Sequence, residues 1–278
     1  MMNKRIMFAA SILILTMLAC GLQGSPTASP SAPTVDPAQL NAIIAETVSA
    51  VLEQTALAPT STPLATATPQ PEPSATPTFW PQTSTNLQLD GTNFFLDERA
   101  GFNISIPPGW LPVRIDQIEY YDAFSLPQAA DPKVQTALMN INTLDPNIYR
   151  LFIFDLQDGH LEGGFVNNVN FIWLIDNSIS LETEDEIKAT AEALPSTVPG
   201  LVVTSYAISK TINDIPIGMI LSETTGQRED GSELKLFQKQ IFLNVEEGYL
   251  TITFTTEQGI KDATLPFFDS IIESLKIY

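Results

Sequence analysis

The stretch Asp97–Trp110, which reads DERAGFNISIPPGW, decides how this chain folds. Apolar and polar residues alternate over Phe102–Ile106, and this period of two predicts a half-buried β-strand. The two prolines that follow end the strand, because proline has no N–H to donate to a ladder. Gly109 then turns the chain and Trp110 adds a large apolar surface. We therefore expect a strand, a turn and a tight core in which Phe102 and Trp110 are buried.

The segments on either side of this stretch extend the pattern. Asn93–Leu96 predicts a strand that pairs with Phe102–Ile106 through the turn Glu98–Gly101. An Asp-Pro pair at residue 131 supplies an N-cap and a first-turn proline for a helix. The next predicted elements are a helix from Asp131 to about Thr143, strands at Tyr149–Leu156 and Phe165–Ile175, and a helix at Thr183–Leu194. Glu182 and Glu184–Glu186 are interpreted as helix-start charges that suit the helix dipole, rather than as metal ligands.

The last third of the chain has the clearest pattern. It predicts an antiparallel meander of strands at Val202–Ser209, Ile217–Glu223, Leu234–Val245 and Tyr249–Thr255. A final helix has one apolar stripe at i, i+3, i+4 and i+7, formed by Phe268, Ile271, Ile272 and Leu275. This order of elements predicts an α+β domain with helices laid across an antiparallel sheet.

The order of these elements resembles that of a known family. A strand running into Gly101–Trp110, a long meander and the closing segment Phe268–Lys276 look like the PsbP-like (Mog-type) family, over about residues 88–278. The resemblance implies a single α/β/α sandwich around a central antiparallel sheet. The family includes bacterial lipoproteins, a photosystem extrinsic subunit and a Ran-binding protein, so the fold is shared by unrelated functions. The shared residues are core and turn residues, and no functional residue is carried over.

The first residues of the chain predict export and lipid anchoring. A positive start at Lys4 and Arg5 precedes a short apolar run, Ile6–Leu18, as in a signal peptide. About 20 apolar residues are needed to span a bilayer, so this run is short for a permanent anchor. Residues 17–21, Met-Leu-Ala-Cys-Gly, resemble a bacterial lipoprotein signal. The resemblance implies removal of residues 1–19 and lipidation of Cys20, with palmitate among the acyl chains. The alternative is an ordinary secreted protein or an uncleaved anchor.

Residues 20–86 predict a low-complexity stalk. They are rich in Ser, Thr, Ala and Pro, so they have little apolar surface to bury. They also contain no Lys or Arg. A helical apolar pattern over about residues 37–56 interrupts the stalk after the N-cap Asp36. Two readings stay open for this segment: a lone helix that frays in water, or a short coiled coil that gives weak self-association. We expect the globular domain to occupy residues 87–278.

The charge of the chain excludes one class of partner. Lys and Arg total 13 against 32 Asp and Glu, which gives a formal net charge of −19. A field of this sign repels phosphate backbones, so nucleic-acid binding is excluded. The lone cysteine, Cys20, has no second cysteine with which to form an internal disulfide.

Few residues in the chain suit catalysis. The single histidine, His160, lies in a glycine-rich loop and is interpreted as a solvated loop residue. Its neighbours Asp155, Asp158 and Glu162 are candidate calcium ligands, but their spacing does not match the EF-hand pattern. Neither a G-x-S-x-G motif nor a phosphate-binding glycine loop is present in the sequence. We therefore expect no catalytic activity and no cofactor.

Two functions are compatible with these observations. The first is a membrane-tethered, extracytoplasmic lipoprotein that acts as a non-catalytic binding or accessory module of the cell envelope. Its sheet edge or loops would contact an envelope protein or a small ligand. The second is a purely structural envelope lipoprotein. A calcium-binding protein and an enzyme are weaker alternatives. A binding surface on the folded domain would favour the first function.

Overall fold

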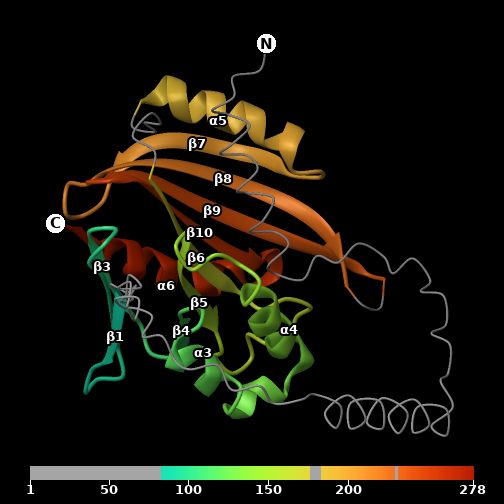
Figure 1. The fold of residues 1–278 in the computed structure, drawn as a ribbon. Helices are drawn as coiled ribbons and strands as arrows, with labels where there is room; N and C mark the ends of the chain where they lie inside the picture. The colour runs from blue at the N-terminus through green and yellow to red at the C-terminus, as the bar shows by residue number, and fades with distance from the viewer. Residues whose placement is uncertain (1–82, 176–182, 229–230) are drawn as a thin grey trace, which may run out of the picture. The chain divides into compact units, whose positions relative to one another are not determined.

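The structure is a computed structural model, and it describes residues 83–175, 183–228 and 231–278 (Figure 1). These residues form two antiparallel sheets. The small sheet has the order β1-β2-β3-β11, from β1 (Thr83–Leu87), β2 (Asn93–Asp97), β3 (Phe102–Ile106) and β11 (Lys276–Ile277). The large sheet has the order β4-β5-β6-β10-β9-β8-β7. Its strands are β4 (Trp110–Val113), β5 (Tyr149–Asp155), β6 (Asn168–Leu174), β7 (Val202–Lys210), β8 (Pro216–Gln227), β9 (Glu233–Val245) and β10 (Gly248–Glu257).

The helices of the described residues are α3 (Ile118–Ala123), η1 (Pro127–Ala130), α4 (Pro132–Ile141), α5 (Glu184–Thr197), η2 (Gln258–Ile260) and α6 (Lys261–Ser274). The starts predicted for α4 and α5 are confirmed, whereas the predicted N-cap Asp36 lies outside the described residues. The side chain of Asp131 accepts a hydrogen bond from the backbone N–H of Lys133 at the start of α4. Thr183 and Glu186 form a capping box at the start of α5, so the acidic first turn serves the helix as predicted. Glu182 lies outside the described residues.

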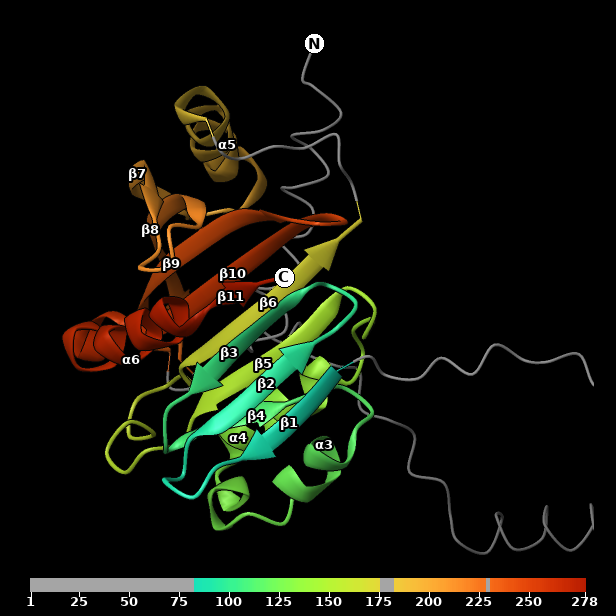
Figure 2. The same ribbon diagram turned by 90° about the vertical axis from the view of Figure 1, so that its left-hand side faces the viewer.

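The large sheet is packed on both faces. One face is covered by α6 and the small sheet, which Figure 2 shows in front of it, around a core that includes Ile104, Phe171 and Phe254. The other face carries two separate apolar clusters. One cluster lies under α3 and α4, and the second lies under α5. The predicted fold class, an antiparallel sheet between layers of helices, is confirmed.

The stretch around Gly101 and Trp110 connects the two sheets. The β2–β3 hairpin pairs Asp97 with Phe102, and Gly101 adopts a positive φ of 71° in its turn. After β3 the chain passes to the large sheet through Gly109, whose φ is also positive at 84°. Trp110 opens β4 and is 2% exposed, and Phe102 is fully buried. Both predictions of core aromatic residues are confirmed.

The structure also differs from the expected layout. The first strands form a separate small sheet instead of extending the central one, because the Pro-Pro-Gly turn redirects the chain after β3. Strand β1 begins at Thr83, before the expected domain start at residue 87. Strand β4 and helix α3 were not predicted, since neither has a long apolar repeat. The helices of the described ranges include none with the length and hydropathy needed to cross a bilayer.

The predictions for the front of the chain are not tested by the fold. The signal segment 1–19, the lipidation residue Cys20, the stalk up to residue 82 and the helical pattern at 37–56 all lie outside the described residues.

Candidate ligand-binding face

A band of uncharged polar side chains crosses the middle of the large sheet. Strands β6, β10, β9 and β8 alternate between two faces, and the apolar residues of the main core point to the α6 side. On the opposite face the same strands carry amides and hydroxyls. We call this set the polar patch: Asn168, Asn170, Ser222, Gln238, Gln240, Thr251, Thr253 and Thr255.

The strand register brings the polar patch together. One row across the sheet runs from Asn170 through Thr253 to Gln240. The next row runs through Asn168, Thr255, Gln238 and Ser222. Residues directly opposite each other on neighbouring strands have Cβ atoms about 4.5–5.5 Å apart, so each row is a continuous line of polar groups.

Apolar residues border the polar patch on both sides. Towards β5, Phe152 pairs with Asn170 and Phe154 pairs with Asn168, and both aromatic residues belong to the cluster under α3 and α4. Towards β8, Ile220 belongs to the cluster under α5. Figure 1 shows α5 beside β7 at one edge of the sheet and α3 and α4 near β4 and β5 at the other. The polar patch thus lies between two helix-covered apolar regions.

The polar patch is buried, and several of its groups lack partners. Thr253, Gln240 and Ser222 are fully buried, and Asn168 and Asn170 are 1% exposed. Gln238 Nε2 donates to Thr255 Oγ1 at 3.1 Å, and Asn168 Nδ2 donates to the Val166 carbonyl at 3.0 Å. The buried side-chain atoms of the polar patch without a hydrogen-bond partner among the described residues include Gln240 Nε2 and Oε1, Thr253 Oγ1, Ser222 Oγ, Asn168 Oδ1 and Asn170 Oδ1, and other such atoms lie elsewhere in the domain, Trp110 Nε1 and Tyr149 OH among them.

This arrangement is unfavourable for folding alone. A buried donor or acceptor without a partner costs about 1–3 kcal/mol, so large natural clusters of such groups are uncommon. Polar residues in a sheet that is covered on both faces are retained where a ligand or ordered water supplies the missing hydrogen bonds. The polar patch is therefore the candidate site, and its chemistry is that of uncharged hydrogen bonding.

Sequence reasoning did not find the polar patch. In segments such as Thr251–Thr255 the polar positions look like the solvent face of an ordinary half-buried strand. Each of the four strands has polar residues at alternate positions, which is not unusual for a single strand. Only the strand register shows that these positions lie in the same rows across the sheet.

His160 is not the solvated loop residue that the sequence predicts. Its Nδ1 lies 2.6 Å from Oδ2 of Asp155, and its side chain is only 18% exposed. Asp155 is fully buried at the end of β5, and Asn167 Nδ2 donates to the same carboxylate oxygen at 3.1 Å. The buried carboxylate draws the glycine-rich loop back onto the sheet. This contact anchors the loop.

The acidic residues near His160 are not gathered into one cluster. Asp155 accepts from His160, Asn167 and the backbone of Gln157, whereas Asp158 is exposed in the loop. In the ranges that the structure describes, no three His, Cys, Asp or Glu side chains are arranged to hold a metal ion. Thr256, on the same side of the sheet as Asp155, bonds to Asn167 at 2.9 Å and to Thr264 at 3.0 Å.

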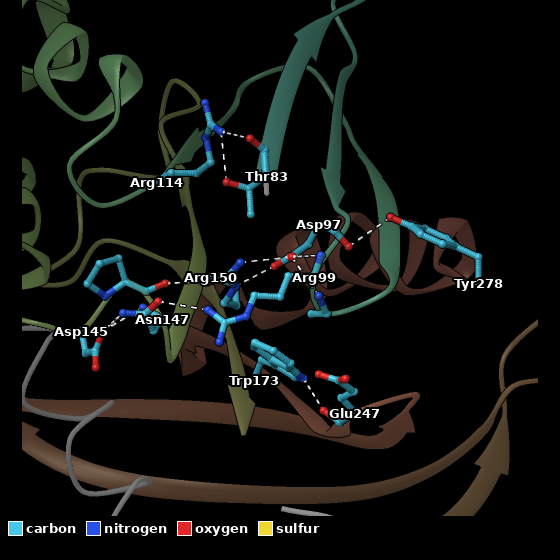
Figure 3. A network of polar contacts seen from close by, with 12 residues as sticks. Thr83, Asp97, Arg99, Arg114, Asp145, Asn147, Arg150, Trp173, Glu247 and Tyr278 are labelled. Carbon is cyan, nitrogen blue, oxygen red and sulfur yellow. Dashed lines mark hydrogen bonds and ion pairs between the residues drawn. The ribbon is translucent and has the colours of Figure 1, made fainter. Parts of the chain in front are cut away.

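A second polar network, shown in Figure 3, joins the two sheets. Arg150 on β5 binds Asp97 at the end of β2 through Nε at 2.7 Å and Nη2 at 3.1 Å. Asp97 also accepts from the backbone N–H groups of Arg99 and Ala100. The guanidinium groups of Arg99 and Arg150 lie 5.0 and 5.5 Å from the centre of the Trp173 ring. Both carboxylate oxygens of Asp97 are bonded, so we interpret this network as a structural joint.

The C-terminal residue belongs to the same joint. The hydroxyl of Tyr278 donates to the Asp97 carbonyl at 3.0 Å, and its backbone N–H donates to the Gly101 carbonyl. Burial, with smaller contributions from Asp97 and Glu98, raises the pKa of Tyr278 above its usual value. A charged residue inside an apolar strand, as Arg150 is, was the only sequence signal for this network.

The chain was compared with known protein families, curated sequences and solved structures, and only solved structures match it. No protein-family model matches the chain, and no curated protein sequence matches it. The solution structure of cyanobacterial PsbP (CyanoP) from Synechocystis sp. PCC 6803 is similar with a TM-score of 0.40 and 11% identity, covering 75% of this chain and 100% of that one. LpqN of Mycobacterium tuberculosis, described as involved in cell envelope biogenesis, has a TM-score of 0.36 and 9% identity over 70% of this chain and 90% of LpqN. A protein of unknown function from Pseudomonas aeruginosa, PA94, has a TM-score of 0.33 and 15% identity over 41% of this chain and 74% of that chain. Similarity at this level assigns neither family nor function.

Proposed function

We propose that this protein is a lipid-anchored, extracytoplasmic binding module of the bacterial cell envelope, and that the polar patch is its binding site. The anchor rests on the sequence pattern that ends at Ala19-Cys20. The binding role rests on one observation, the cluster of buried polar groups without partners on one face of the sheet. Such a cluster lowers stability unless a ligand or ordered water supplies the missing hydrogen bonds, and a binding role accounts for its retention.

The binding role is tested by removing polar groups from the polar patch. Gln240→Leu and Thr253→Val replace unpartnered polar groups with apolar groups of similar size. If the polar groups exist for a ligand, both variants unfold at the same or a higher urea concentration than the wild type, because no hydrogen bond is lost. Destabilisation of both variants by more than about 1 kcal/mol would mean that these groups serve folding, and the proposal would fail.

The anchor is tested separately in cells. We expect labelled palmitate to be incorporated into the wild-type protein but not into a Cys20→Ser variant. Ser11, which lies in the predicted apolar run, provides a matched control: Ser11→Ala should label like the wild type. Equal labelling of the wild type and Cys20→Ser would end the lipoprotein interpretation.

A further inference from the structure

We propose that the domain docks onto the surface of a lipid bilayer through the end at which the chain enters it. This inference deepens the proposed function, since it rests on the lipid anchor at Cys20 and adds a direct contact between the domain and the membrane. The contact surface consists of exposed apolar side chains on α3 and around the turn after β1. We call this set the apolar end: Leu87, Leu89, Ile118, Tyr121 and Phe124.

On α3 the exposed apolar side chains form one stripe. Ile118 and Tyr121 are three residues apart, and Phe124 follows after three more, so all three lie on one side of the helix. Ile118 is 67% exposed and Tyr121 is 59% exposed. The rings of Tyr121 and Phe124 pack edge-on against Tyr120, with ring centres 5.2 and 5.3 Å away. Tyr120 is buried, so it holds the two exposed rings in place.

Strand β1 lies beside α3 and extends the same surface. Arg114 donates to the carbonyl oxygen of Thr83 at 2.6 Å and to its hydroxyl at 3.1 Å, as Figure 3 shows. The hydroxyl of Thr85 donates to the carboxylate of Glu119 on α3. Leu87 is two residues beyond Thr85, so it lies on the same face of β1, towards α3, and it is 72% exposed. The apolar end is therefore one surface, and surfaces of this kind mark contacts with proteins or membranes.

The chain enters the domain at this same end, because residues 1–82 lead directly into Thr83. Residues 21–82 separate the predicted lipid at Cys20 from β1, and their composition is that of a flexible linker. A flexible linker of this length has a root-mean-square span of about 45 Å, which gives the domain an effective concentration at the bilayer of roughly a few millimolar. A weak apolar contact is sufficient to dock the domain under these conditions.

The charges near the apolar end specify the kind of lipid. Three exposed acidic residues lie close to it in the sequence: Asp90, Asp116 and Asp122. The nearby cation, Arg114, is already paired with Glu119. Anionic lipids would be repelled by this surface, so the fitting surface is a zwitterionic bilayer, such as one of phosphatidylethanolamine. Tyrosine suits this place, since its ring is apolar and its hydroxyl remains in the headgroup region.

A protein is the competing occupant of the apolar end. A basic partner would complement the three acidic residues, but acidic residues occur throughout the domain and do not distinguish this end from the rest of its surface. The entry of the predicted tether does distinguish it. The tether is therefore the observation that favours lipid over protein.

The experiment uses the full chain as its cells produce it, with one added cysteine. Ser125→Cys places a thiol beside Phe124, and Ser196→Cys places one on α5, which Figures 1 and 2 show at the opposite end of the described structure. Each thiol carries a polarity-sensitive dye, and the protein is reconstituted into phosphatidylethanolamine and phosphatidylcholine vesicles with nitroxide-labelled acyl chains. We expect the nitroxide to quench the dye at residue 125 but not the dye at residue 196.

Matched substitutions test the side chains themselves, with the dye at residue 125. Ile118→Ser and Tyr121→Ser change the apolar end, whereas Ile212→Ser and Tyr206→Ser make the same changes at exposed positions on or near β7. Each change in the apolar end should lower the ratio of docked to undocked domain about tenfold, and the controls should leave it unchanged. Replacing half of the phosphatidylcholine with phosphatidylglycerol should also lower this ratio.

Several results would overturn the inference. Absence of quenching at residue 125 in protein that floats with the vesicles refutes docking but leaves the anchor intact. Equal quenching at both labelled positions, or unchanged quenching in Ile118→Ser and Tyr121→Ser, has the same consequence. A dye at residue 125 that brightens without being quenched means that the apolar end packs against protein, such as a second copy, instead of lipid. Protein that does not float, and whose Cys20 takes up the dye, refutes the anchor of the proposed function, and the docking inference falls with it.

Discussion

Replacing Asp97 with alanine should destabilise the protein strongly, because Asp97 joins the two sheets. Its side chain is fully buried, and the Arg150 side chain that it binds is only 7% exposed. Arg150 reaches it through two hydrogen bonds, at 2.7 and 3.1 Å, and the backbone N–H groups of residues 99 and 100 bind it at 3.1 and 3.0 Å. The substitution therefore leaves a buried guanidinium without its counter-charge and two N–H groups without an acceptor.

The expected loss is about 3–5 kcal/mol, the range for breaking a buried ion pair by removing one partner. Most of this loss is the cost of the stranded Arg150 charge rather than the net value of the pair. Removing both partners together, in Asp97→Ala with Arg150→Met, should therefore cost less than the sum of the two single changes. The loss of the double variant should fall short of the sum of the two single losses by about 1–3 kcal/mol, as for residues in one hydrogen-bonded network.

Urea unfolding followed by far-ultraviolet circular dichroism measures all four proteins of this cycle. An Asp158→Ala variant provides the control, since Asp158 is an exposed aspartate and its loss should change stability by at most about 0.5 kcal/mol. A loss below about 1 kcal/mol for Asp97→Ala, or additivity of the two single changes, would refute the structural role assigned to the pair.

Three further predictions concern other parts of the domain. Trp110→Ala should lower the free energy of unfolding by about 3–5 kcal/mol in urea melts, because the side chain is 2% exposed; a loss below about 1 kcal/mol would place it outside the core. Burial tends to raise the pKa of Glu119, but hydrogen bonds from Thr85 and Arg114 outweigh it and lower the pKa. Glu119→Gln should therefore melt at a lower temperature than the wild type at pH 7. This difference in melting temperature should disappear as the pH falls below about 4, because the wild-type carboxylate is then protonated; a difference that persists there would contradict the prediction. Burial raises the pKa of Tyr149 to about 12, so above pH about 10 the unfolded state releases a proton that the folded state keeps. Wild-type stability should fall more steeply with pH there than that of Tyr149→Phe, and parallel curves would show that Tyr149 is not buried as described.

The local elements could be predicted from the sequence because their signals are local. The Asp-Pro cap at residue 131, the acidic first turn of α5 and the stripe ending at Leu275 each act within a few residues, and each element is present. The strands of the meander follow their apolar alternation in the same way. Elements without such a signal were missed, as with β1 at Thr83–Leu87, whose contacts are supplied from a distance by Arg114 and Glu119.

The candidate site could not be predicted, because its meaning depends on strand register. Asn170, Thr253 and Gln240 are far apart in the chain and each lies in an ordinary alternating strand. Their polarity would be unremarkable on a solvent face. It becomes a functional signal only where the three side chains share one row and are buried, and where each has at least one polar atom without a partner.

The sequence by itself determined the class of fold and the acidic charge, since short-range periodicity and composition carry these properties. It also carries the export and anchoring signal that we expect at Cys20, and from the charge we expect no binding to nucleic acid. The tertiary structure alone decided that the opening hairpin forms its own sheet, that His160 is held by a buried carboxylate, and that Asp97 binds Arg150. It also decided which face of the large sheet carries the polar patch. These features depend on side chains from distant segments meeting in a space from which water is excluded. Their energies come from burial and pairing, and neither is defined until the chain has folded.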